Sequence, residues 1–381
     1  MKTKIKRMII VPMTLGVLIG LIISIYGYKY DRSFLKSIHA YIDNYFLKFI
    51  YTYVCLVVGC IIGIIIHESG HLVTGLLSGY EFVSFRICSM VWVKENGKLS
   101  RKRFNIMGTA GQCLMMPPDS DTPEKVPFVL YFLGGGLFNL IAAVICIPIG
   151  FVISNFYFSM LFLTFGFISA WMCFLNLIPL NIRVPNDGYN IVLYSRNKAK
   201  RIVLYKELRL NGLLYKGYEL SDIPENLFDF GEESDGLGEI FQAGLYAYKK
   251  DFSAAQNLLE KVLNRDKLIS IYEYEAKSEL LFCKVVNGAP EHEIEELYDK
   301  TLKKYILFSA KTQISKRRLM YAYYSIYKHD MESAEREYNK AVAMKDTYPI
   351  PGELKSELSL IEFIRTSVEN GCFTNISKSS R

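Results

Sequence analysis

The sequence has no paired pattern of cysteines. Its eight cysteines are scattered singly, without a Cys-x-x-Cys motif, and four of them (Cys55, Cys60, Cys146 and Cys173) lie inside apolar runs. This distribution argues against a disulfide framework and against a cysteine-based zinc site, so we expect buried free thiols. The sequence also has no glycine-rich loop that would cradle a phosphate and no pattern of base-stacking aromatic residues. We therefore expect no nucleic-acid partner.

Long apolar runs dominate the first 180 residues, whereas the remainder is charged and rich in tyrosine. Four runs are long enough to cross a bilayer, which takes about 20 residues. They are 8–26, 49–77, 126–153 and 156–180. The first follows the basic stretch MKTKIKR and has no small-residue cleavage site, which is typical of an uncleaved signal anchor. The third and fourth runs are almost contiguous, which predicts a helical hairpin.

Basic residues predict the orientation of the chain in the membrane. The stretch 82–105 has six basic residues and one acid, and the stretch 183–216 has eight basic residues and two acids. Together with the basic N-terminus, these stretches lie on one side if the chain crosses four times, and basic loops stay in the cytoplasm. We expect an integral membrane protein with both termini in the cytoplasm.

The second predicted span carries the sequence HESGH. His67 and His71 are four residues apart, so on a helix both imidazoles lie on one face, about 5–6 Å apart between Cβ atoms. The two imidazoles are then close enough to bind one metal ion, and Glu68 can act as general base toward a water bound to that ion. Ionisable groups are costly inside a span, so three within five residues need a reason. One Zn²⁺ per chain supplies it, because zinc with an open fourth position lowers the pKa of bound water to about 7.

A third metal ligand has to come from elsewhere in the chain. The strongest candidate is Asp187 in NLIPLNIRVPNDGYN, where Asn176 and Pro179 end the fourth predicted span. That end lies on the same side of the membrane as His67 and His71. An Asp before a Gly at a helix break is also ordinary turn chemistry, so the ligand and the turn remain alternatives at this point.

These motifs, in this order, resemble the site-2 protease family of intramembrane zinc metalloproteases. The resemblance covers residues 49–195 and includes HExxH inside a span, GGGLFN in the third predicted span, and Asn-x-x-Pro followed by Asp-Gly. It implies an endopeptidase acting in or near a transmembrane segment of a membrane protein or a signal-peptide-like substrate. It also implies that His67, His71 and Asp187 bind zinc, in a cell membrane that we expect to be bacterial. Seven residues separate Pro179 from Asp187, whereas the family usually has four.

Two further segments of the predicted core have alternative interpretations. The family's GxxxN motif maps to Gly135 and Asn139, and the resemblance implies that Asn139 contacts the substrate backbone or the oxyanion; an interhelical hydrogen bond is the alternative. VWVKENGKLS predicts a β-hairpin with its turn at 96–97, which either holds an extended peptide by strand addition or is a plain surface feature. The segment 111–127 is predicted to be a gating loop or a linker.

The C-terminal part is predicted to be helical from 238 to about 368. It follows the stretch 217–248, which has eight acids and no basic residue. Two segments match at a separation of 79, where Tyr248-Lys-Lys-Asp251 aligns with Tyr327-Lys-His-Asp330. The accompanying spacing of small and large residues resembles tetratricopeptide-type helix pairs. Stacks of such pairs bind peptides in a concave groove or serve only for packing, so a cytoplasmic peptide or protein partner is one expectation.

The sequence therefore predicts an all-α polytopic membrane protein with about four transmembrane helices, a small β-hairpin after the HExxH helix, and a C-terminal soluble α-helical repeat domain. The expected parts are a signal-anchor span and loop (1–48), a metalloprotease core (49–195), a basic juxtamembrane segment and acidic linker (196–232), and the repeat domain (233–381). The expected function is an intramembrane zinc endopeptidase. The alternative is a membrane-anchored helical-repeat adaptor with a vestigial metal site.

Overall fold

A computed structural model describes residues 38–95, 98–104, 110–181, 185–231, 233–234, 236–265 and 268–373. The chain divides into two compact units, which are described separately. The first consists of the chain up to His67 and of Gly135–Leu175, and the second of Glu68–Gly134 and of the chain from Asn176 onward. The first predicted span, 8–26, lies outside the described residues.

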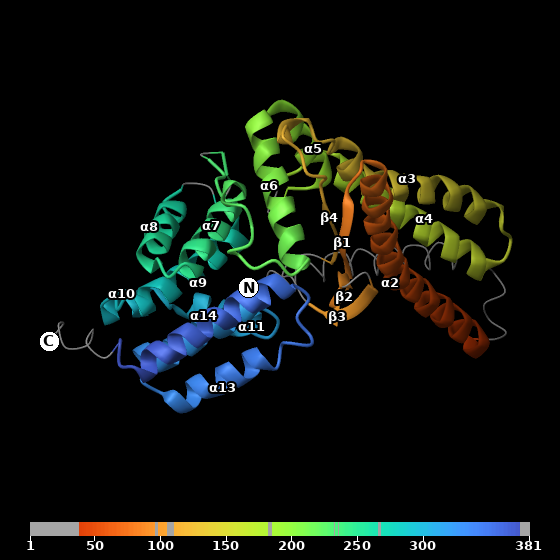
Figure 1. Ribbon diagram of the computed structural model, residues 1–381. Coiled ribbons are helices and arrows are strands. Elements are labelled where there is room, and N and C mark those ends of the chain that lie inside the picture. The colour runs from red at the N-terminus through yellow and green to blue at the C-terminus, as the bar shows by residue number, and fades with distance from the viewer. Residues whose placement is uncertain are drawn as a thin grey trace. The chain divides into compact units, whose positions relative to one another are not determined.

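Within the described part of the chain, three helices are long and apolar enough to cross a membrane (Figure 1). They are α2 (Ile38–Leu77), α3 (Val129–Val152) and α4 (Phe156–Leu177). Apolar side chains such as Val57 and Ile61 of α2 are exposed, which suits surrounding lipid rather than water. The predicted runs 49–77, 126–153 and 156–180 are thus confirmed as helices of spanning length. The last helix ends before residue 180, since Pro179 cannot continue it.

The first unit contains the predicted helical hairpin of α3 and α4. The Ser159 hydroxyl donates to the carbonyl of Gly150 at 2.7 Å, which joins the two helices next to their connection. The side-chain oxygen of Asn155 accepts from the backbone N–H of Tyr157 at 3.0 Å, at the start of α4. The Tyr51 hydroxyl of α2 donates to the carbonyl of Tyr157 at 2.8 Å. These bonds satisfy polar groups for which lipid offers no partner.

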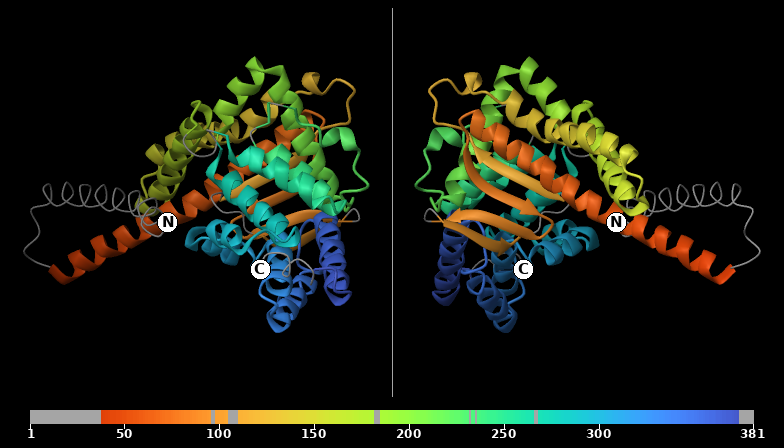
Figure 2. Two further views of the ribbon diagram at one scale, coloured as in Figure 1. Left: turned by 90° about the vertical axis from the view of Figure 1, so that its left-hand side faces the viewer. Right: turned by 90° about the vertical axis from the view of Figure 1, so that its right-hand side faces the viewer.

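The second unit contains a four-stranded antiparallel sheet with strand order β3-β2-β1-β4 (Figure 2). The strands are β1 (Glu81–Ile87), β2 (Met90–Glu95), β3 (Lys98–Arg103) and β4 (Gly111–Met116). The antiparallel pair β2 and β3 is the predicted hairpin. The prediction of a gating loop or linker is wrong for 111–116, because these residues form β4, with Cys113 to Met116 buried. A continuous buried run lacks the alternation that marks a strand in sequence.

The rest of the second unit is helical, as predicted for its C-terminal part. The chain enters α3 through η2 (Pro123–Lys125), and α5 (Asp187–Arg196) and α6 (Lys198–Tyr215) follow the last span. The remaining elements are η3 (Glu225–Leu227), α7 (Leu237–Tyr248), α8 (Phe252–Leu263), α9 (Ser270–Val286), α10 (Glu291–Leu297), α11 (Lys300–Ser309), α12 (Ile314–Ala322), η4 (Tyr323–Tyr327), α13 (Met331–Val342) and α14 (Pro351–Glu369).

One hydrophobic core joins the sheet, α6 and the C-terminal helices. It contains Val93 of β2, Leu210 of α6, Leu259 of α8 and Ile361 of α14. In addition, the Lys102 ammonium of β3 donates to the carbonyl of Tyr348 at 2.9 Å. The segment predicted as a basic juxtamembrane stretch therefore forms a helix with a buried face.

The two turns that match in sequence also match in geometry. In the turn before α8, Lys250 has φ of 69°, and the Asp251 side chain accepts from the N–H of Ala254. In the turn before α13, His329 has φ of 51°, and the Asp330 side chain accepts from the N–H of Ser333. Each turn thus places a left-handed residue directly before an Asp N-cap, which is a favoured start of a helix.

Candidate metal centre

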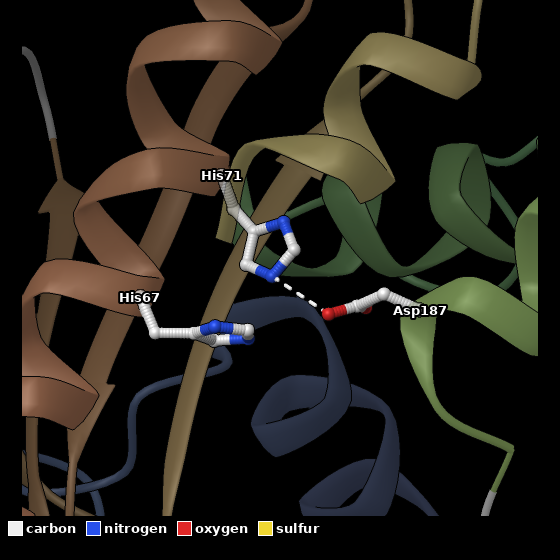
Figure 3. Close-up of side chains that lie close together, drawn as sticks. All are labelled: His67, His71 and Asp187. Atoms are coloured by element: carbon white, nitrogen blue, oxygen red, sulfur yellow. Dashed lines mark ion pairs between the residues drawn. The ribbon is translucent and has the colours of Figure 1, made fainter. Parts of the chain in front are cut away.

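The structure brings His67 and His71 of α2 together with Asp187 of α5 (Figure 3). One ligand atom from each of the three residues lies within 4.8 Å of the others. Figure 3 shows the two imidazoles extending from α2 toward the carboxylate at the start of α5. His67, His71 and Glu68 are all buried, at 7–8% exposed. The three predicted ligands therefore form one group that can hold a metal ion.

The distance between His71 and Asp187 fits a shared ion. Nε2 of His71 lies 3.4 Å from Oδ2 of Asp187. Two ligands of a tetrahedral zinc lie about 3.3–3.4 Å apart, because each bond is about 2.0–2.1 Å long. A direct N–H···O hydrogen bond is typically about 2.7–3.2 Å. The two atoms, which form an ion pair here, are thus at a distance that would also suit two ligands of one ion.

A backbone carbonyl of α3 orients His71. Nδ1 of His71 lies 2.7 Å from the carbonyl oxygen of Tyr131. A carbonyl only accepts, so Nδ1 carries the proton and Nε2 keeps the lone pair that a metal needs. The Tyr131 ring also packs against the His71 ring, with 5.6 Å between the ring centroids, and stacks on the Tyr80 ring, with 5.2 Å between the centroids. Sequence reasoning missed Tyr131, because a backbone acceptor has no side-chain signature.

Asn139, also of α3, contacts the other histidine. Its side-chain Nδ2 lies 3.3 Å from Nδ1 of His67, and the residue is completely buried. The predicted contact of Asn139 with substrate or oxyanion stays a prediction. In the structure, the Asn139 amide lies beside His67, which is a candidate metal ligand.

Asn186 joins the start of α5 to Leu180, which follows α4. The Asn186 side-chain oxygen accepts from the N–H of Leu180 at 3.1 Å and from that of Tyr189 at 2.9 Å. Its own backbone N–H donates to the carbonyl of Leu180 at 3.2 Å. Because these bonds keep Asn186 beside Leu180, the longer spacing from Pro179 does not carry Asp187 away from the histidines.

Two glycines allow the close contacts of the elements that carry the ligands. A Cβ on Gly188 would lie 2.2 Å from the carbonyl oxygen of Leu177, so only glycine lets α5 begin against the end of α4. A Cβ on Gly134 would lie 2.0 Å from Oγ1 of Thr74 and 2.5 Å from the carbonyl oxygen of Gly70. The second contact brings α3 against the helical turn that carries His71. The role of Gly134 was not predicted, since the sequence pattern directed attention to Gly135.

The Glu68 carboxylate acts electrostatically on two residues of the sheet. Burial raises the pKa of the Cys113 thiol in β4, and the negative charge of Glu68 adds to that rise. Burial lowers the pKa of Arg86 in β1, and the charge of Glu68 opposes that fall. An apolar cluster that includes Tyr80, Met115 and Phe128 packs on the same side of the sheet as Cys113. The carboxylate is thus held in an environment with little water, where charges interact strongly.

The chain matches no protein-family model, no curated protein and no solved structure with which it was compared. The function of the site is therefore argued from its own geometry.

Proposed function

We propose that this protein is an intramembrane zinc endopeptidase. The observation that carries the proposal is the set of His67, Glu68 and His71, buried on a helix of membrane-spanning length, with Asp187 of α5 close enough to share a metal ion with both histidines. Two histidines and one carboxylate are the protein ligands of catalytic zinc in well-known metalloproteases, with a further position for water. The cost of ionisable groups in a span supports a functional role for His67, Glu68 and His71.

The residues divide the reaction between them. Bound zinc would lower the pKa of a water to about 7 and polarise the scissile carbonyl. Glu68 would take the proton of that water and pass it to the leaving amine. The carbonyl of Tyr131 keeps His71 in the tautomer that binds through Nε2. Because the site lies on a span, the proposed substrate is a transmembrane segment of a membrane protein or a signal-peptide-like peptide.

The proposal extends to the topology of the chain. It adds a first span at 8–26 to the three candidate spans in the described residues, which makes four. It also places both termini in the cytoplasm of a bacterial cell. The three basic stretches support this orientation. A reporter fused after Arg381 tests it: activity from a reporter that works only in the cytoplasm is expected, and activity from one that works only outside the cell contradicts it.

The C-terminal helices are proposed to be a tetratricopeptide-like repeat that binds a cytoplasmic peptide or protein. The support is the pair of turns at Lys250-Asp251 and His329-Asp330, which share sequence and geometry. These helices are also the basis of the second candidate function, a membrane-anchored adaptor with a vestigial metal site.

The experiment that separates the two candidates compares metal content and cleavage. The full chain in detergent is expected to hold one zinc per chain and to cleave a model transmembrane substrate. Glu68→Gln keeps the shape of the side chain but removes the base, so zinc is expected to remain while cleavage falls by orders of magnitude. His71→Ala and Asp187→Ala are expected to lose both. A wild-type chain without zinc and without cleavage supports the adaptor.

A further inference from the structure

Two residues of α3 face the Nδ1 atoms of the two histidines on α2. The carbonyl oxygen of Tyr131 lies 2.7 Å from Nδ1 of His71, and the Asn139 amide lies 3.3 Å from Nδ1 of His67. In both cases the contact is with the ring nitrogen nearest the backbone. The same helix thus contacts both rings at their Nδ1 atoms, once through its backbone and once through a side chain.

The orientation of the Asn139 amide decides whether His67 can bind a metal through Nε2. If the NH₂ group faces Nδ1, it donates to that nitrogen, and the ring proton must then sit on Nε2 and block it. If the amide rotates by half a turn, its oxygen accepts from Nδ1–H at the same place, and Nε2 keeps its lone pair. Only the second arrangement matches the tautomer that the Tyr131 carbonyl imposes on His71.

The hydrogen-bond count of the amide does not favour the blocked arrangement. With the NH₂ group toward His67, the Asn139 side-chain oxygen is buried and has no hydrogen-bond partner among the described residues. After rotation the NH₂ group takes that position instead. The count thus gives the present orientation no advantage, and the orientation is decided by which nitrogen of the His67 ring must stay free of a proton to bind a metal.

We propose that Asn139 is a positioning residue that accepts a hydrogen bond from Nδ1–H of His67 with its side-chain oxygen and so fixes His67 as an Nε2 ligand. The inference rests on the proposed zinc site but assigns Asn139 a different task from contacting substrate. Outer partners of this kind fix the ring and its tautomer, and losing one typically costs about 10–100-fold in metal affinity.

Two substitutions separate this role from a contact with substrate. Asn139→Asp keeps an acceptor and removes the donor, whereas Asn139→Leu removes both at similar size. Zinc affinity of the full chain in detergent is measured by competition with a chromogenic chelator. We expect Asn139→Leu to bind zinc about 10–100-fold more weakly than the wild type, and Asn139→Asp to bind within about threefold of it. The absorption spectrum of bound Co²⁺ should change in the Leu variant only.

Asn155→Ala is the matched control, because it removes an asparagine from the same helical hairpin, one whose side-chain oxygen accepts from the backbone N–H groups of Tyr157 and Phe158. It should bind zinc like the wild type. If Asn139→Leu does not elute as a folded protein, Asn139→Ala takes its place. Wild-type zinc affinity in the Leu or Ala variant, or an Asp variant as weak as the Leu variant, overturns the positioning role while leaving the protease proposal intact. A wild-type chain that binds no zinc overturns both.

Discussion

The absence of one Cβ atom, at Gly188, lets Asp187 reach the histidines. An alanine at position 188 would put its Cβ 2.2 Å from the carbonyl oxygen of Leu177, so α5 would have to move away from the end of α4. We predict that Gly188→Ala lowers zinc affinity roughly tenfold or more without removing a ligand, since a small displacement of a ligand weakens a metal site. Chelator competition measures the effect.

The control for this prediction is Gly244→Ala in α7. A Cβ at Gly244 has no neighbour within 4 Å, so alanine fits there. It should leave zinc affinity unchanged and raise the free energy of unfolding by up to about 1 kcal/mol, because alanine favours a helix more than glycine does. Equal zinc affinities for the 188 and 244 variants would mean that Gly188 does not position Asp187.

Glu353 of α14 should make stability depend on pH. Burial raises its pKa to about 8 from an ordinary value of 4.5, and the neighbouring carboxylate of Glu357 adds to the rise. The folded chain then binds more protons than the unfolded chain between about pH 4.5 and pH 8, so this group destabilises the fold as pH rises through that window. Glu353→Gln, which cannot ionise, should have a higher free energy of unfolding than the wild type at pH 8.5, by about 1–3 kcal/mol after allowance for partial solvent screening, and should therefore melt at a higher temperature. The two proteins should melt alike near pH 4.5; a constant difference across the range contradicts the assignment.

The site shows which residues a sequence can reveal. His67, Glu68 and His71 were predictable because one helical period places them together, and Asp187 because an Asp-Gly pair at a helix break is visible. Tyr131 was not predictable, since it acts through its carbonyl oxygen.

At the scale of elements, apolar length and turn chemistry predicted well, and buried strands did not. The three described spans and the hairpin β2–β3 agree with the prediction, because long apolar runs and Asn-Gly turns are strong local signals. The strands β1 and β4 were missed for different reasons. Strand β1 follows directly after the end of a helix, and β4 is a short continuous apolar run beside prolines, which resembles a linker.

Helix α12 carries two buried cations, Lys316 and Arg318. Lys316 is fully buried, with Nζ 2.6 Å from Oε2 of Glu275 on α9, and Arg318 is 2% exposed, with Nε 2.6 Å from Oε2 of Glu357 on α14. Arg318 also pairs with Glu279 and lies 3.8 Å over the Phe282 ring. These contacts join three helices through charge rather than through apolar packing alone.

We predict that Arg318→Ala lowers the free energy of unfolding by about 3–5 kcal/mol, because it removes the cation that Glu279 and Glu357 share and leaves Lys316 alone to pair with Glu279. Arg336→Ala is the matched control, since Arg336 is exposed and pairs with Glu332 within one helix. Such a surface pair contributes only about 0.3–0.5 kcal/mol. Thermal unfolding of both variants in detergent, followed by circular dichroism, measures the difference. Similar midpoints for the two variants would show that the buried network adds nothing to stability.

At the scale of the whole molecule, the hydrophobic core that α6 shares with the C-terminal helices moves the start of the C-terminal part toward the N-terminus. The sequence places this boundary at 233, after an acidic linker. In the structure, however, the chain before that point packs on the C-terminal helices. The N–H of Leu220 donates to the Ser356 hydroxyl at 3.2 Å, and the Tyr248 hydroxyl donates to the Glu219 carboxylate at 3.0 Å. Leu210 and Leu214 of α6 belong to the same core as Ile361 of α14.

The last prediction compares two fragments, 197–381 and 233–381, in urea unfolding. The longer fragment retains α6, and burying one leucine side chain contributes about 1.5–3 kcal/mol, so it should be more stable by at least about 2 kcal/mol. Its transition should also be steeper, because more surface becomes exposed when it unfolds. A longer fragment in which Leu210 and Leu214 are both replaced by alanine controls for length alone and should fall back to the stability of the shorter one. Equal midpoints for the two unmodified fragments would support the boundary at 233 and assign α6 to the membrane-proximal part of the chain.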